Sequence, residues 1–287
     1  MSSFVYAKLP AKYIVGIRLR GSGLANCLFV YGRAIMLEQG MSLEMITPTW
    51  ANFSPGPFLR LERDKRTYIG LFSPDGVSGL KKYILLLFSR KYVDKGSFEL
   101  SLAKRKILVT EGLQTYFKDL IPYYKMIRER LIDKANVDLE TRLSNDNFIG
   151  VHVRLGDFNE ERRTPLSWYG NIIKRLSNDL SDEFKFVIFS DGSDQELTEL
   201  LRLPNVERAS GFNALEDLFL LSYSRLIIGS DSTFSGWAAF LNQTPIIMMK
   251  NHFGDILANP ENQVVMGGND EFPASITNLL FRLRSLD

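Results

Sequence analysis

Two polar side chains interrupt the most strand-like run of the sequence, "FIGVHVRLGDF" at residues 148–158. Side chains alternate across a strand, so His152 and Arg154 share one face of it, and Val151 and Val153 share the other. Ligands of parallel α/β sheets bind at the carboxyl ends of the strands, where Arg154 lies. A guanidinium there suits a phosphate, because its fork can donate two charge-assisted hydrogen bonds.

A structural interpretation of the same strand remains open. Arg154 would then form an ion pair with Asp157 at the strand end. His152 would be a buried histidine whose hydrogen bonds are satisfied within the core. These residues alone do not decide between the two interpretations.

A second strand–turn–helix segment, "GSDSTFSGWAAFL" at residues 229–241, carries hydroxyl groups directly before a predicted helix. A helix N-terminus has unpaired N–H groups and a positive potential, so a phosphate can bind near Ser232 and Thr233. The alternative is that one of these hydroxyls only caps the helix. We expect this cap one strand end along from Arg154.

A third segment, "RGSGLANCLF" at residues 20–29, is a glycine turn between a predicted strand and a predicted helix. It fails the dinucleotide fingerprint GxGxxG, because Asn26 stands where the third glycine would be. The turn either lets a substrate approach the backbone closely or is a simple tight turn.

Other catalytic patterns are absent from the sequence. It has no GxxxxGK[ST] and no GxSxG, and its two histidines are too far apart for HExxH. The nearest metal-like string, "DGSD" at residues 191–194, is more typical of a turn and a helix cap. We therefore expect no metal, with Arg154 supplying the positive charge that Mg²⁺ would supply. The single cysteine, Cys27, excludes a disulfide or a cysteine-built zinc site within one chain.

Strands and helices alternate in both halves of the chain, which predicts an α/β fold with two parallel sheets. We expect domains at residues 1–146 and 147–287, joined near residues 136–147. The predicted strands are 12–19, 42–46, 106–112, 148–154, 184–190, 225–230 and 244–250. The predicted helices are 27–40 (ending at Gly40), 117–135, 166–180, 193–202, 213–223 and 272–285.

The charge is uneven along the chain. Residues 1–146 hold 23 Lys and Arg against 14 Asp and Glu, and residues 147–287 hold 12 against 19, although the net charge is +2. The basic half suggests an anionic acceptor or a membrane surface. Nucleic acid is not an expected partner, because no recognition motif is present.

Two segments of the basic half have a separate interpretation. The apolar run "KKYILLLFSRKY" at residues 81–92 is expected to be a core helix, with a membrane-surface helix as the alternative. Residues 47–80 lack a clear hydrophobic period and are expected to be an insertion that contacts an acceptor substrate. With no recognisable signal peptide or 18-residue apolar window, we expect a cytoplasmic protein, with peripheral contact at the inner face of the membrane as an addition.

The order of three segments is more specific than any one of them. "GSGLANCLFVYGRA", "GVHVRLGDF" and "EDLFLLSYSRLIIGSDSTFSGWAAFLN" together resemble the glycosyltransferase family 11 α-1,2-fucosyltransferases. They also resemble, more distantly, the protein O-fucosyltransferases and α-1,6-fucosyltransferases of the same superfamily. The segments look like that family's GLGNQMFQYA, HxRRxD and LMSxCxxxIxxNSTFSWWAAYL elements.

The resemblance implies a GT-B fold, in which two Rossmann-like domains with parallel sheets face a central cleft. The N-terminal domain would be the acceptor side, and the C-terminal domain would bind the GDP-sugar. The implied activity is an inverting, metal-independent transfer of fucose from GDP-fucose to a glycan hydroxyl, in the first place α-1,2 to galactose. No cofactor besides the donor substrate is expected. The basic half suggests a lipid-linked or lipopolysaccharide glycan as the acceptor.

The resemblance also implies roles for residues of this chain. Arg154 would hold the β-phosphate of the donor, and His152 would brace it or contact the nucleotide. Asp217 would accept hydrogen bonds from guanine N1–H and N2–H₂. The other donor-binding residues would be Ser232, Thr233 and Phe234 at the diphosphate and ribose, and Gly23 and Asn26 at the sugar.

Departures from the family elements concern the sugar and the linkage more than the nucleotide. Leu155 replaces the second arginine of HxRR, and Gly236 replaces one tryptophan of SWW. The catalytic base must accept a proton from the acceptor hydroxyl; Asp157 is the first candidate and His152 the second. Alternatives are another GDP-sugar, another fucosyl linkage, and a non-catalytic glycan- or nucleotide-binding protein of the same fold.

Overall fold

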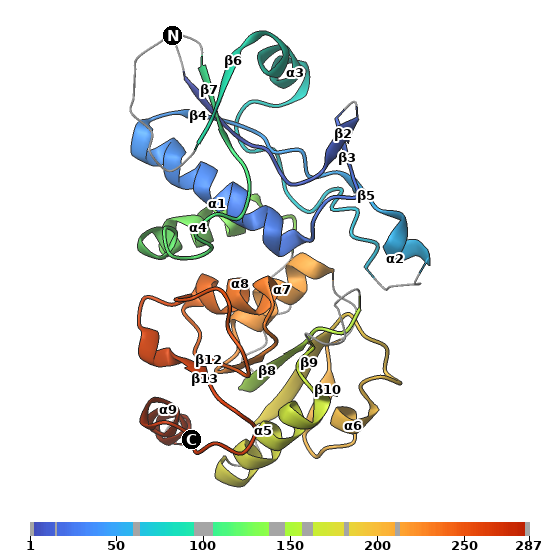
Figure 1. Ribbon diagram of the computed structural model, residues 1–287, viewed down its shortest axis with the longest axis vertical. Helices are drawn as coiled ribbons and strands as arrows, with labels where there is room; N and C mark the ends of the chain where they lie inside the picture. The colour runs from blue at the N-terminus through green and yellow to red at the C-terminus, as the bar shows by residue number, and fades with distance from the viewer. Residues whose placement is uncertain are drawn as a thin grey trace. The chain divides into compact units, whose positions relative to one another are not determined.

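The computed structural model describes residues 3–14, 16–59, 64–94, 106–137, 147–156, 163–180, 184–209 and 213–284. The chain divides into two compact units: unit 1 comprises Met1–Leu61 and Lys65–Val137, and unit 2 comprises Glu62–Asp64 and Asp138–Asp287. Each unit carries its own parallel sheet (Figure 1). The expected boundary between residues 146 and 147 borders residues outside the described part, so it stays a prediction.

The main sheet of unit 1 has four parallel strands in the order β4-β1-β7-β6. They are β1 (Phe4–Ala7), β4 (Glu44–Ile46), β6 (Arg90–Val93) and β7 (Lys106–Thr110). Helix α1 (Leu24–Met41) packs against this sheet and against α4 (Tyr124–Lys134). Leu85 and Leu86 of α3 (Gly79–Phe88) pack against a separate apolar cluster that includes Phe4 and Tyr6 of β1.

Two predictions for the N-terminal part of unit 1 are wrong. Residues 12–19 are not one strand: β2 (Lys12–Ile14) and β3 (Ile17–Leu19) form an antiparallel hairpin, and Gly16 with φ +79° turns the chain between them. β3 also pairs with β5 (Asn52–Phe53), which precedes the short helix α2 (Pro55–Leu59). Helix α1 does not end at Gly40, because it is Ser42 that takes the left-handed conformation, with φ 51°.

The interpretation of residues 81–92 as a core helix is wrong for most of that segment. Within α3 the buried residue is Lys82, whereas Leu80, Leu87 and Phe88 are largely exposed. Strand β6, which follows, is exposed on all four of its residues. Because apolar residues occur on two sides of α3, the sequence pattern alone does not reveal which side faces the sheet. In the structure it is the side that carries Leu85 and Leu86.

The sheet of unit 2 has six parallel strands in the order β10-β9-β8-β11-β12-β13. Its strands are β8 (Phe148–Val153), β9 (Lys185–Ser190), β10 (Val206–Arg208), β11 (Ile227–Gly229), β12 (Ile246–Met248) and β13 (Gln263–Val265). Its helices are α5 (Leu166–Asp179), α6 (Thr198–Leu201), α7 (Ala214–Ser222), α8 (Thr233–Asn242) and α9 (Ala274–Arg284). All four strands predicted for this half are present, whereas β10 and β13 were not predicted.

Strand β8 places its side chains as the period of two predicts. Val151 and Val153 join an apolar cluster with Trp168 and Tyr169 of α5. His152 faces the other way and contacts residues of α8. One face of β8 is therefore core, and the other directs His152 toward the start of α8.

Candidate functional site

Three neighbouring strands of unit 2 end at one edge of its sheet. Strands β9, β8 and β11 are adjacent and parallel, so their carboxyl ends meet there. Asp191, Arg154 and Ser230 follow these ends directly. Such an edge is where parallel α/β sheets bind ligands.

Arg154 forms an ion pair with Asp191. Arg154 Nη1 lies 2.6 Å from Asp191 Oδ2, and the two side chains are 25% and 18% exposed. Asp191 Oδ1 also accepts hydrogen bonds from the backbone N–H groups of Leu155 (2.9 Å) and Gly156 (3.1 Å). One carboxylate therefore fixes both the guanidinium and the loop that follows β8. The partner named in the structural interpretation, Asp157, lies outside the described residues.

The Asp191 carboxyl is held in its ionised form. Burial works to raise its pKa, but Arg154 and the two backbone N–H groups outweigh burial, so the pKa lies below its ordinary value. Gly156 makes this close approach feasible, because a Cβ atom there would lie 2.5 Å from Asp191 Oδ2. Glycine at this position thus serves the site rather than a turn.

His152 is buried and neutral. Its Nδ1 lies 2.6 Å from Ser235 Oγ, and its ring stacks on Phe234 with 4.9 Å between centroids and 25° between planes. Burial lowers the pKa of His152 to about 3, because the lowering by burial and by Arg154 exceeds the raising by Asp191. A buried imidazole with this pKa positions its neighbours and is poorly suited to accept a proton near neutral pH.

Ser230 ties the end of β8 to the end of β11. Its hydroxyl donates to the carbonyl of His152 (2.9 Å) and accepts from the backbone N–H of Arg154 (2.8 Å). The Tyr169 hydroxyl lies 2.8 Å from the same oxygen. Burial raises the pKa of Tyr169 to about 12, so its hydroxyl stays protonated and can donate to Ser230. The backbone that carries the guanidinium is thereby fixed from both sides.

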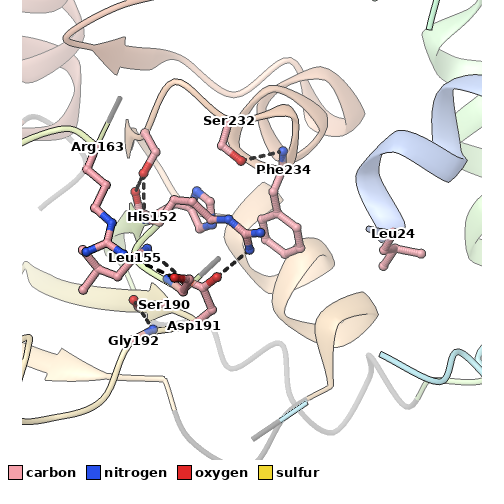
Figure 2. A network of polar contacts seen from close by, with 12 residues as sticks. Leu24, His152, Leu155, Arg163, Ser190, Asp191, Gly192, Ser232 and Phe234 are labelled. Atoms are coloured by element: carbon pink, nitrogen blue, oxygen red, sulfur yellow. Dashed lines mark hydrogen bonds and ion pairs between the residues drawn. The ribbon is translucent and has the colours of Figure 1, made fainter. Parts of the chain in front are cut away.

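The start of α8 lies beside this cluster. Ser232 is the N-cap, and its Oγ accepts from the backbone N–H of Phe234 at 3.3 Å. Thr233 is the first helical residue. Figure 2 shows His152 beside Phe234, with Asp191 and Ser232 close by. The structure thus brings the predicted residues of β8 and α8 together at one edge.

Comparison with known proteins finds a family that part of this chain resembles. The family model described as Glycosyl transferase family 11 matches residues 118–256. This segment is similar to that family. The O-antigen biosynthesis glycosyltransferase WbnK of Escherichia coli is 25% identical over 182 residues, which cover 55% of this chain and 60% of that protein. The predicted resemblance to this family is confirmed over residues 118–256, which contain the second and third of the sequence segments.

Solved structures of fucosyltransferases share the fold. The crystal structure of NodZ α-1,6-fucosyltransferase co-crystallised with GDP aligns with a TM-score of 0.54 and 17% identity, over 86% of this chain and 94% of that one. NodZ from Bradyrhizobium aligns with a TM-score of 0.54 and 16% identity, over 87% and 96%. At this identity the likeness concerns the fold alone, and it confirms the predicted α/β fold of the GT-B class.

The remaining predicted donor residues lie in two places. Asp217 is in the first turn of α7, which packs against α8 inside the family 11 segment. Gly23 and Asn26 lie outside that segment, in unit 1: Gly23 is the N-cap of α1, and its carbonyl accepts from the N–H of Asn26 at 3.1 Å. The contacts of Asp217, Gly23 and Asn26 with the donor remain predictions.

Sequence reasoning missed a histidine–carboxylate pair within the segment that matches family 11. Asp231 directly precedes the cap of α8, and its Oδ1 lies 2.6 Å from His252 Nδ1 and accepts from the His252 backbone N–H at 3.2 Å. His252 comes shortly after β12, the strand next to β11. The sequence signal was a histidine just past a predicted strand end. Asp191 was missed in the same way, since "DGSD" was interpreted only as a turn and cap.

Two further features are absent from the residues that the structure describes. No group of three or more His, Cys, Asp or Glu could hold a metal ion in that part of the chain. No helix in it has the length and apolarity needed to cross a membrane.

Proposed function

We propose that this chain is a glycosyltransferase that moves fucose from GDP-fucose to a glycan hydroxyl, in the first place α-1,2 to galactose. Transfer would invert the sugar configuration and need no metal. The observation that carries the proposal is Arg154, held by Asp191 and Ser230 beside the start of α8. The family 11 match and the fold shared with NodZ support the reaction class.

The cluster suits a diphosphate. A guanidinium has five N–H donors, so the Asp191 contact at Nη1 is compatible with further bonds to phosphate oxygens. The start of α8 adds backbone N–H groups and a positive helix end. Both would stabilise the negative charge that develops on the departing GDP, in place of a metal ion.

The acceptor hydroxyl must lose its proton as the new glycosidic bond forms. Because His152 is buried and its pKa is about 3, we assign it to positioning Phe234 and the end of β8. Asp157 therefore remains the candidate base, from outside the described residues. Gly23 and Asn26 of unit 1 would contact the sugar, and Asp217 would contact guanine.

The acceptor is proposed to be a membrane-associated glycan, either lipid-linked or part of a lipopolysaccharide, and met in the cytoplasm at the inner face of the membrane. The basic character of residues 1–146 supports an anionic acceptor. WbnK, to which the chain is similar, is described as an O-antigen biosynthesis enzyme.

The first test is calorimetry of GDP, ADP and UDP binding without metal. Arg154→Ala should weaken GDP binding by about 2 kcal/mol, or about thirtyfold, the scale of a lost charged hydrogen-bond pair. Arg225→Ala is the matched control: this arginine bonds to Asn147 at the opposite end of β8, so GDP binding should be unchanged. Equal binding of the three nucleotides, or equal affinity of Arg154→Ala and wild type, would refute the donor site.

The alternatives separate in a second experiment, the turnover of GDP-sugars with galactosides. Turnover of GDP-fucose with an α-1,2-linked product supports the proposal. Turnover of a different GDP-sugar, or a different linkage, identifies another transferase of the same fold. GDP binding with neither transfer nor donor hydrolysis identifies a non-catalytic binding protein.

A further inference from the structure

Helix α3 of unit 1 has its polarity reversed relative to an ordinary surface helix. Five apolar side chains point outward, with exposed fractions as follows: Leu80 76%, Tyr83 48%, Ile84 49%, Leu87 74% and Phe88 79%. Lys82 of the same helix is buried, at 6% exposed. Surface helices of soluble proteins normally show the opposite arrangement.

The outward residues form one stripe. Positions 80, 84, 87 and 88 are spaced i, i+4, i+7 and i+8, which places them on one face of a helix. Leu85 and Leu86 instead pack against the apolar cluster of β1, β4 and β7. The helix thus has two apolar sides, and the sheet covers only one of them.

Lys82 fixes this orientation. Its Nζ donates to Thr49 Oγ1 at 2.9 Å and lies over the rings of Tyr6 (5.8 Å) and Tyr83 (5.9 Å). Burial lowers the pKa of Lys82 to about 8. Rotation of the helix about its axis would break the Thr49 bond, so the exposed stripe is held outward by contacts inside the unit.

The exposed stripe continues onto the hairpin of β2 and β3. A Cβ atom at Gly16 would lie 2.4 Å from the Tyr83 hydroxyl oxygen, so the hairpin turn touches α3. Ile14 and Ile17 flank this turn and are exposed as well. We call these residues together with the α3 stripe the outer apolar patch. A contiguous exposed apolar surface of this kind marks an interaction site.

The rim of the outer apolar patch is basic. Lys81 lies within α3, and Arg90 and Lys91 begin β6 directly after it; all three are exposed. Figure 1 shows α3 beside β6. Apolar side chains flanked by lysine and arginine are complementary to a bilayer surface that carries anionic headgroups.

We propose that the outer apolar patch docks unit 1 onto an anionic lipid bilayer. Leu80, Leu87 and Phe88 enter the boundary between headgroups and acyl chains, and Lys81, Arg90 and Lys91 contact anionic headgroups. The docking is peripheral and does not depend on the proposed fucosyl transfer. It names the surface through which the chain would meet a lipid-linked acceptor.

The test is sedimentation of the full chain with vesicles of phosphatidylcholine alone and of phosphatidylcholine mixed with phosphatidylglycerol. Wild type should bind the mixed vesicles at low salt, dissociate from them at high salt, and not bind vesicles of phosphatidylcholine alone. Leu87→Ser with Phe88→Ser, and separately Lys81→Glu with Lys91→Glu, should each lower the bound fraction about tenfold.

Matched controls come from unit 2. Val265→Ser removes an apolar residue that is 53% exposed, and Lys185→Glu reverses an exposed charge, so both should bind as wild type. Circular dichroism checks that each variant is folded. The vesicle assay needs no nucleotide, so its result stands even if the fucosyltransferase proposal fails.

Three results would overturn the proposal. They are no binding of wild type to the mixed vesicles, unchanged binding of the Leu87→Ser, Phe88→Ser variant, and a wild-type dimer that this variant dissociates without any lipid binding. The last would make the outer apolar patch a contact between two copies of the chain.

Discussion

The neutral state of His152 predicts how stability depends on pH. Burial lowers its pKa to about 3 in the folded chain, whereas an unfolded histidine titrates near pH 6.5. Between these values the unfolded chain binds a proton that the folded chain does not, so acidification favours unfolding. The stabilisation is therefore fully present above about pH 6.5 and is lost as the pH falls toward 3.

The magnitude follows from proton linkage. From about pH 7 to about pH 5, one such histidine costs the fold about 2 kcal/mol. This free-energy cost is the same for any folded pKa well below 5. His152→Gln keeps a hydrogen-bonding group toward Ser235 but does not titrate. Wild type should therefore lose about 2 kcal/mol more than this variant over the same interval.

The assay is urea denaturation of both proteins at each pH. Subtracting the variant's loss of unfolding free energy from that of wild type cancels the contributions of the other titrating groups, because both proteins share them. His252→Gln is the control and should keep the drop that His152 causes. Equal pH dependence of wild type and His152→Gln would show that His152 is protonated or solvated in the folded chain. It would refute the buried, neutral state that we assign to His152.

Three further predictions concern the groups around Arg154. Asp191→Asn keeps an acceptor for the loop N–H groups but loses the ion pair, so denaturation near pH 7 should show a loss of about 1–2 kcal/mol. Because the pKa of Asp191 is lowered, this difference between wild type and variant should shrink below about pH 4, and a constant difference would contradict it. Gly156→Ala forces a methyl group onto the Asp191 carboxylate and should lower the unfolding free energy by about 1–3 kcal/mol, measured in urea; unchanged stability would mean that the loop simply moves. His252→Gln removes the imidazole that contacts the Asp231 carboxylate beside α8 and should reduce GDP affinity about fivefold by calorimetry, whereas unchanged affinity would place this pair outside the proposed donor site.

Much of unit 2 could be predicted from sequence because its strands are short, apolar and separated by helices. The alternation in β8 placed His152 and Val151 on opposite faces, as observed. The partner of Arg154 could not be found this way. It depends on β9 lying next to β8, and strand order is set by tertiary packing rather than by any local pattern.

The errors in unit 1 have a similar origin. A branched, alternating run at residues 12–19 satisfies the pattern of one strand, and only the left-handed Gly16 divides it into a hairpin. In α3 apolar residues occur on two sides of the helix, so its period cannot say which side faces the sheet. The buried hydrogen bond between Lys82 and Thr49 decides it, and that contact joins residues 33 positions apart.

At the sheet edge of unit 2, the contacts of Arg154 fix the orientation of its guanidinium but reduce the net positive charge there. Arg154 and Asp191 are opposite charges 2.6 Å apart, so together they attract an anion less than a lone arginine would. In exchange the guanidinium is held in one orientation, with its backbone fixed by Ser230 and its neighbour His152 stacked on Phe234. An oriented guanidinium loses little further freedom when it binds a phosphate, so in the proposed reaction Arg154 would stabilise the charge on the leaving diphosphate without reorienting. A neutral His152 fits the same logic, because a second cation beside Arg154 would compete with it for Asp191.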